Sequence, residues 1–146
     1  MGGSIFIAML AAVFLWWFST GAILLVVRLL ENHSLLTKLK VCIFSLPILA
    51  LGLWGIWETS SSLTILGSYL AFISAILVWG WIELTFLTGV ITGPNKSKCP
   101  KNITLFEKFI RAWGTLAYHE VSLLLALGVV IYLGYGQENH FGIWTF

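Results

Sequence analysis

Long runs of apolar residues dominate the chain and occur four times, over residues 5–27, 41–57, 63–91 and 115–135. Each run is close to the ~20 residues that a helix needs to cross about 30 Å of hydrocarbon. The runs are continuous rather than alternating, which disfavours the strands of a barrel. The pattern therefore predicts an all-α, polytopic membrane bundle of four transmembrane helices. We expect Pro47 to kink the second helix, because it removes a backbone donor and crowds the preceding turn.

Composition supports a membrane protein. Hydrophobic residues make up 59% of the chain and charged residues only 10%, whereas a soluble domain carries about 25% charged residues. Eight Trp and ten Phe fit the aromatic belts that anchor helices at the two faces of a bilayer. We expect residues 1–146 to form a single transmembrane domain in contact with lipid, without nucleic acid as a partner.

The basic residues give the bundle an orientation. All eight lie in the two segments that join the first helix to the second and the third to the fourth. By the positive-inside rule both segments face the cytoplasm, which places the N-terminus and the tail after residue 135 outside. These residues are Arg28, Lys38, Lys40, Lys96, Lys98, Lys101, Lys108 and Arg111.

Apolar and charged residues alternate at helical spacing over residues 105–113, within the second basic segment. This spacing is typical of a short amphipathic helix that lies on the inner membrane surface. It is equally typical of a cytoplasmic extension of the fourth membrane helix. The sequence leaves both interpretations open.

Glu83 is the most unusual polar residue, because it lies within the third apolar run. The helix is expected to leave the bilayer near Gly93 and Pro94, so Glu83 lies roughly 15 Å deep. An acidic residue at that depth costs about 3 kcal/mol and should face protein or a water-filled cavity. Glu83 is therefore expected to point into the bundle and to have a polar partner.

The fourth helix supplies candidate partners in the same cytoplasmic half of the membrane. His119 lies ~9 Å deep and Glu120 ~10 Å deep, with Tyr118 beside them. Neighbouring residues point about 100° apart on a helix, so only one of the three needs to face Glu83. The expected intramembrane polar cluster consists of Glu83, Tyr118, His119, Glu120 and Thr88, with Thr85 as a further donor.

Three roles fit such a cluster. It can be a polar clasp, which is an interhelical hydrogen bond that fixes the register of two neighbouring helices. It can be a ligand site, in which His119 coordinates a metal such as the magnesium of a chlorophyll-type pigment. It can also do chemistry, as a proton path or a metal centre. Three histidines in all argue against a di-iron membrane oxygenase, and no nucleotide-binding, serine-hydrolase or zinc-protease motif occurs. Neither a resident metal nor an obligatory cofactor is expected.

Paired tryptophans raise the question of pigment contact. Trp54 and Trp57 lie near the outer face, where the aromatic belt explains them. Trp16 and Trp17 lie in the middle of the first span. They can stack on pigment rings or carotenoids, or pack between helices.

Four stretches carry a resemblance to a known family: "FLWWFSTGAIL" (14–24), "LVWGWIELTFLTGVITGPNKSKCP" (77–100), "LAYHEVSLL" (116–124) and "FGIWTF" (141–146). Together they resemble the PuhE family of photosynthetic complex assembly proteins. They occur in that order over nearly the whole chain. The resemblance extends to the motif positions Glu83, Thr88, Gly89, Gly93, Pro94, Cys99, Pro100, Tyr118, His119 and Glu120.

The resemblance implies a non-enzymatic role in the multi-pass inner (intracytoplasmic) membrane of a phototrophic bacterium. The implied partners are the polypeptides of the reaction centre and light-harvesting 1 complex, either during assembly or as a permanent subunit. The alternative is a membrane enzyme or transporter in bacteriochlorophyll or lipid metabolism that uses Glu83 and His119. Members of that family continue beyond the last motif with further hydrophobic segments, so this chain is expected to be either a shortened form or the N-terminal part of a longer protein.

Overall fold

Helices account for nearly all of the chain that the computed structural model describes, which is residues 2–93, 99–100 and 103–146, with side chains from residue 5 onward. Four stretches within them are long and apolar enough to cross a membrane. The all-α prediction with four spans is confirmed. The helices are α1 (Gly2–Leu30), α2 (Leu35–Phe44), α3 (Leu46–Thr59), α4 (Ile65–Leu87), α5 (Leu105–Gly134) and α6 (Phe141–Thr145).

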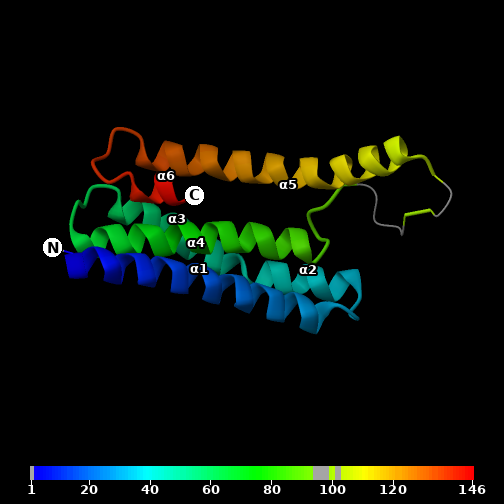
Figure 1. Ribbon diagram of the computed structural model, residues 1–146, viewed down its shortest axis with the longest axis horizontal. Coiled ribbons are helices and arrows are strands. Elements are labelled where there is room, and N and C mark those ends of the chain that lie inside the picture. The colour runs from blue at the N-terminus through cyan, green and yellow to red at the C-terminus, as the bar shows by residue number, and fades with distance from the viewer. Residues whose placement is uncertain (1, 94–98, 101–102) are drawn as a thin grey trace.

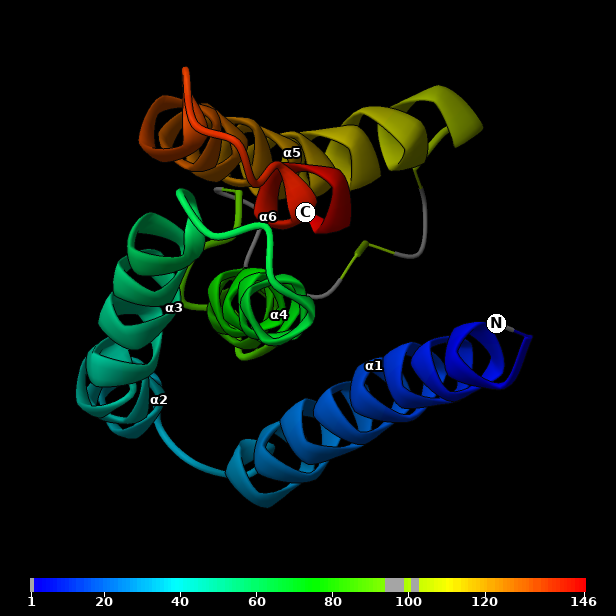
Figure 2. The same cartoon turned by 90° about the vertical axis from the view of Figure 1, so that its left-hand side faces the viewer.

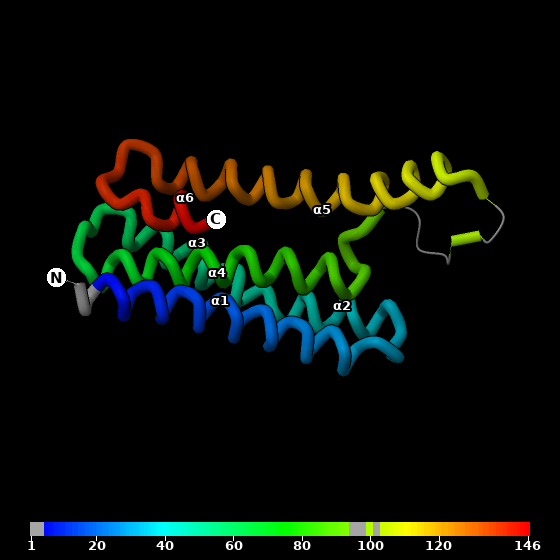
Figure 3. The backbone as a smooth tube through the Cα atoms, viewed as in Figure 1, coloured from blue at the N-terminus to red at the C-terminus, as the bar shows by residue number. Residues whose placement is uncertain are grey.

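Helix α4 is the centre of the bundle, and Figure 2 shows α1, α3 and α5 arranged around it. The α1–α2 turn and the segment after α4 lie at one end (Figure 1), and the N-terminus, the α3–α4 turn and the α5–α6 turn lie at the other. The tube in Figure 3 follows the same path. The end with the α1–α2 turn carries Arg28, Lys38 and Lys40, so the positive-inside rule assigns it to the cytoplasm.

The second predicted span, residues 41–57, is two helices rather than one kinked helix. Helix α2 begins at Leu35, capped by the Ser34 side chain, and α3 begins at Leu46. Ser45 joins them, and Pro47 falls in the first turn of α3. A proline there is tolerated, because the first backbone N–H groups of a helix have no partner within it. The break therefore lies just before the proline, and Lys38 and Lys40 are helical.

The other boundaries also differ from the prediction. Helix α1 is longer than residues 5–27, whereas α4 is shorter than residues 63–91. Helix α4 ends because Gly89 adopts a φ of 79°, a left-handed conformation that glycine adopts without steric cost. The backbone N–H groups of Val90 and Ile91 then donate to the Thr85 carbonyl at 3.0 Å.

The segment 105–113 is a continuous extension of the fourth membrane helix, which decides between the two interpretations of its amphipathic pattern. Helix α5 starts at Leu105 rather than near residue 115. A capping box marks its start, since the Glu107 N–H donates to Thr104 Oγ1 at 3.2 Å and the Thr104 N–H donates to Glu107 Oε2 at 2.9 Å. This reciprocal pair satisfies two backbone donors and allows the helix to begin there.

Small residues let α3 and α4 approach closely. A Cβ added to Gly52 would lie 2.9 Å from the backbone oxygen of Ser74. Membrane helices commonly associate through such small residues, because lipid supplies no hydrophobic drive for helix contact. The buried cluster beside this contact consists of Ile56, Val78, Ile82 and Val130.

The tail after α5 returns to the bundle at the end opposite the α1–α2 turn (Figure 1), which is the end that the positive-inside rule assigns to the outer face. Helix α6 packs against α4 and α5, and Gly142 lies against Ile56 and the backbone of Ala71. Asn139 is only 4% exposed, and its Nδ2 donates to the carbonyls of Thr59 and Ser62 at 2.9 and 2.8 Å. This turn therefore fastens the outer ends of α3, α4 and α5 together.

Candidate functional site

The expected contact between Glu83 and the fourth span is present. His119 Nε2 on α5 lies 3.2 Å from Glu83 Oε1 on α4, and the two side chains are 10% and 17% exposed. Helices α4 and α5 are therefore neighbours, and the two side chains that join them are largely shielded from the surface of the protein. A carboxylate held this way at the expected membrane depth avoids much of the cost of facing lipid.

Phe86 covers the imidazole of His119. Their ring centroids lie 4.2 Å apart with an interplanar angle of 21°. Phe86 follows Glu83 by three residues, so both side chains share one face of α4. That spacing was visible in the sequence, but only the contact with His119 gives Phe86 a role in the site.

His119 Nδ1 is buried and has no hydrogen-bond partner among the described residues. The proton shared by the pair has two arrangements. Either Nε2–H donates to the Glu83 carboxylate and leaves the Nδ1 lone pair unused, or a protonated Glu83 donates to Nε2 and leaves an Nδ1–H unused. In both arrangements His119 keeps one unsatisfied polar atom inside the protein, and such an atom is uncommon in folded structures.

A pigment magnesium on Nε2 would have to displace Glu83, because that nitrogen already faces the carboxyl group at 3.2 Å. Across the described parts of the chain, no group of three or more His, Cys, Asp or Glu side chains is placed to hold a metal ion. The structure therefore shows a close acid–base pair of Glu83 and His119.

The rest of the predicted cluster does not join this pair. Tyr118 is 53% exposed and Glu120 is exposed as well, because neighbours on a helix point about 100° apart and His119 occupies the inward direction. Thr88 is buried, but its hydroxyl donates to the Leu84 carbonyl at 2.7 Å and lies 3.5 Å from Cys42 Sγ. It therefore connects α4 to α2, and Thr85 likewise donates within its own helix, to the Ile82 carbonyl.

The family-motif residues after α4 form a turn rather than part of the polar pair. Gly93 is buried, and a Cβ added to it would overlap the carbonyl oxygen of Gly114 on α5, so the turn approaches the backbone of α5 closely at this residue. Cys99 is a free, exposed thiol, and Pro100 is exposed. Pro94 lies outside the described residues.

Cys42 and Trp81 form a contact that the sequence did not predict. The Trp81 indole N–H donates to the Cys42 carbonyl at 3.2 Å, and Cys42 itself is 2% exposed. The carbonyl is available because α2 ends two residues later, where its last carbonyls have no partner within the helix. Trp81 therefore ties α4 to the break between α2 and α3.

These features define a polytopic α-helical membrane protein with a largely buried Glu–His pair between its third and fourth spans. The chain belongs to the family described as "Protein of unknown function (DUF3623)", which matches residues 3–146. It is 41% identical over 137 residues to the "Uncharacterized 30.4 kDa protein in puhA 5'region" of Rhodobacter capsulatus. The match covers 94% of this chain and 50% of that protein, so the chain spans half the length of this relative. No solved structure matches.

Breaking the Glu83–His119 pair is expected to reveal an energetic coupling of about 0.5–2 kcal/mol between the two side chains. The measurement is a double-mutant cycle with Glu83→Ala, His119→Ala and the double variant, using the free energy of unfolding in detergent micelles. Glu120→Ala is the matched control, because Glu120 is an exposed carboxylate next to His119. Additive effects of Glu83→Ala and His119→Ala would show that the two side chains do not act as a clasp.

Proposed function

We propose that this chain is part of a non-enzymatic membrane protein that assembles with, or stays bound to, a bacterial photosynthetic reaction centre and light-harvesting 1 complex. The observation that carries the proposal is the 41% identical relative named for its position in the puhA 5' region, a photosynthesis gene locus. The resemblance of residues 77–100 and 116–124 to the PuhE assembly proteins points to the same complex. The membrane in question is then the bacterial inner, intracytoplasmic one.

The exposed side of α1 supports an interaction within the membrane. Phe14, Trp16, Trp17 and Phe18 lie mid-span with exposures between 57% and 67%, and α1 packs mainly on α4. Phe14 and Phe18 stack on each other with centroids 6.0 Å apart. Aromatic side chains give large contact areas to pigments or to other helices. The part of α1 around Trp16 and Trp17 is accordingly the contact face that we assign to the complex.

Co-purification tests the proposal. An affinity-tagged copy of the natural full-length protein, expressed in phototrophic cells, is expected to retain reaction-centre or light-harvesting polypeptides through mild detergent extraction. Replacing Trp16 and Trp17 by leucine should lower their recovery several-fold, since the replacement removes two large rings while the helix stays apolar. Recovery is quantified by mass spectrometry of the eluted polypeptides.

The matched control replaces Trp54 and Trp57 by leucine. Both residues are 58% exposed but lie on α3, away from the proposed face, so recovery should stay unchanged. A tagged protein that elutes alone and free of pigment would overturn the proposal. Equal losses in the two double variants would show that α1 is not the contact face.

A membrane enzyme or transporter is the second candidate, and the unsatisfied Nδ1 of His119 beside Glu83 favours it. Such a buried acid–base pair can accept and release a proton. Glu83→Gln keeps the shape of the carboxyl group and removes its charge, and His119→Phe keeps bulk and removes both nitrogens. Loss of a defined pigment or lipid product in both variants, with the photosynthetic complexes intact, would favour this candidate over the first.

A further inference from the structure

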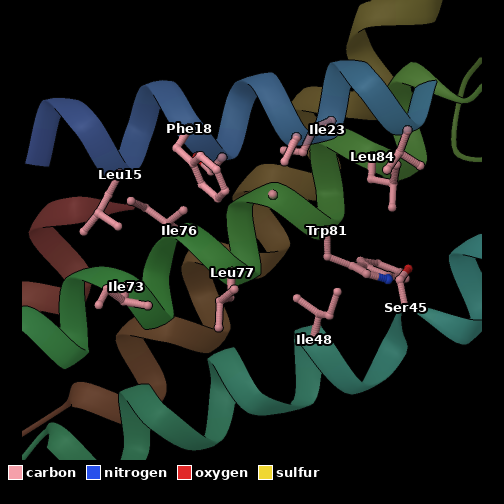
Figure 4. A pocket seen from close by; sticks show the side chains of 14 residues that line it. Leu15, Phe18, Ile23, Ser45, Ile48, Ile73, Ile76, Leu77, Trp81 and Leu84 are labelled. Atoms are coloured by element: carbon pink, nitrogen blue, oxygen red, sulfur yellow. The ribbon is translucent and has the colours of Figure 1, made fainter. Parts of the chain in front are cut away.

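An apolar groove runs between α1, α4 and the start of α3. Its volume is about 340 Å³, and Figure 4 shows side chains of α1 and α4 converging on it with Ile48 on the opposite wall. On α1 it extends from Leu15 to Val26, a length of about 16 Å. That is about half of the ~30 Å hydrocarbon core, or the depth of one leaflet.

The polar groups that line the groove are already satisfied. Ser19 and Ser45 donate to carbonyls of their own chain, both at 2.9 Å, and the Trp81 indole donates to the Cys42 carbonyl. The groove therefore offers a ligand only apolar contact. A hydrocarbon chain needs no polar partner and can extend along the ~16 Å of the groove, so an acyl chain is the ligand that this lining suits.

A basic mouth lies at the cytoplasmic end of the groove. Val27 on α1 and Leu87 on α4 line it, and they follow Val26 and Leu84 of the groove by one and three residues. Arg28 from α1 and Lys38 from α2 converge there together with Glu31, so two positive charges face one negative charge. In the described parts of the chain the Glu83–His119 pair is the only ion pair, so neither cation has a carboxylate within 4.0 Å.

We propose that this groove and mouth bind an anionic phospholipid of the cytoplasmic leaflet, with its phosphate between Arg28 and Lys38 and an acyl chain along α1 and α4. Basic pockets between membrane helices on the cytoplasmic side are suited to anionic lipid headgroups. The positive-inside rule accounts for the presence of these cations. It does not account for their convergence from two helices at the end of an apolar groove. The inference is independent of which complex the chain joins.

The test is native mass spectrometry of the purified protein in detergent, titrated with phosphatidylglycerol or with phosphatidylcholine of the same acyl chains. Each basic side chain near a headgroup contributes about fivefold in affinity. We therefore expect phosphatidylglycerol to bind on the order of tenfold more tightly after the opposing effect of Glu31. Millimolar inorganic phosphate should not compete, because it lacks the acyl chain.

Two variants separate the mouth from the groove. The double variant Arg28→Gln with Lys38→Gln should weaken phosphatidylglycerol more than the zwitterionic phosphatidylcholine, and the preference for phosphatidylglycerol should disappear. Ala22→Trp should weaken both lipids several-fold, because Ala22 lines the groove and a large side chain there would fill it. The control Lys40→Gln with Lys108→Gln removes the same charge from residues outside the mouth and should behave as the unmodified protein.

Several results would overturn the proposal. Equal affinity of the unmodified protein for the two lipids would overturn it. Competition by inorganic phosphate would also overturn it. An equal loss of the phosphatidylglycerol preference in the control variant would show that the preference comes from the net positive charge of the protein and not from the mouth. A photo-crosslinking amino acid in place of Ala22 is expected to label lipid in native membranes, and labelling of a polypeptide instead would assign the groove to a protein partner.

Discussion

Replacing Gly52 by leucine is expected to lower the free energy of unfolding by about 3 kcal/mol. A Cβ at this position would lie 2.8 Å from Val78 Cγ2 and 2.9 Å from the Ser74 carbonyl oxygen. Backbone of α4 cannot rotate away as a side chain can, so α3 and α4 must separate. Their separation would also loosen the buried cluster around Ile56 and Val78.

The measurement is reversible unfolding in mixed micelles, followed by far-ultraviolet circular dichroism. Gly128→Leu is the matched control, because Gly128 is also helical but has nothing within 4 Å of an added Cβ. That variant should be neutral or slightly stabilising, since leucine has the higher helix propensity. Similar destabilisation by the two substitutions would mean that the close approach of α3 and α4 is not what Gly52 provides.

Replacing Asn139 by alanine is expected to cost about 3 kcal/mol, from three side-chain hydrogen bonds of about 1 kcal/mol each. Two of them are donated by Nδ2 to the carbonyls of Thr59 and Ser62. In the third, Asn139 Oδ1 accepts from the Phe141 N–H at 3.0 Å. Without the side chain, α6 keeps only its apolar contacts, and the backbone bond from the Asn139 N–H to the Ser60 carbonyl remains.

Hydrogen exchange of the α6 amides measures the docking directly, and it should accelerate in Asn139→Ala while exchange in the centre of α4 is unchanged. Asn139→Asp is the sharper variant, because it keeps the acceptor for Phe141 and removes both donors. Gln137→Ala, at an exposed position in the same turn, is the control and should leave exchange unaltered. Unchanged protection of α6 in both Asn139 variants would show that its apolar face alone holds it in place.

Asn139 also shows why the membrane spans could be predicted from the sequence whereas the contacts of the connecting turns could not. The hydropathy of each long run is a property of that run alone, which is why four spans and the central position of Glu83 could be predicted. An asparagine in a polar turn carries no such local signal. Its three partners lie between two and about eighty residues away in the sequence, and only the folded chain brings them together.

The same distinction applies to the polar pair. Depth and desolvation cost required a partner for Glu83, and the candidates were residues 118–120 of the fourth span together with Thr85 and Thr88 of the third. The orientation of α5 about its own axis directs His119 toward Glu83 and leaves Tyr118 and Glu120 pointing outward. That orientation is set by packing along the whole helix, including Val130 in the buried cluster, and no local pattern encodes it.

By itself, the sequence determined the helical class, the number of spans, the end of the bundle that carries positive charge and the need for a polar contact at Glu83. These follow from transfer energies of single residues and short segments. The tertiary structure decided that the second span breaks at Ser45, that α6 returns to the bundle and that an apolar groove ends between Arg28 and Lys38. These features depend on how separate helices pack against one another, because a groove or a docked tail exists only where two or more surfaces meet.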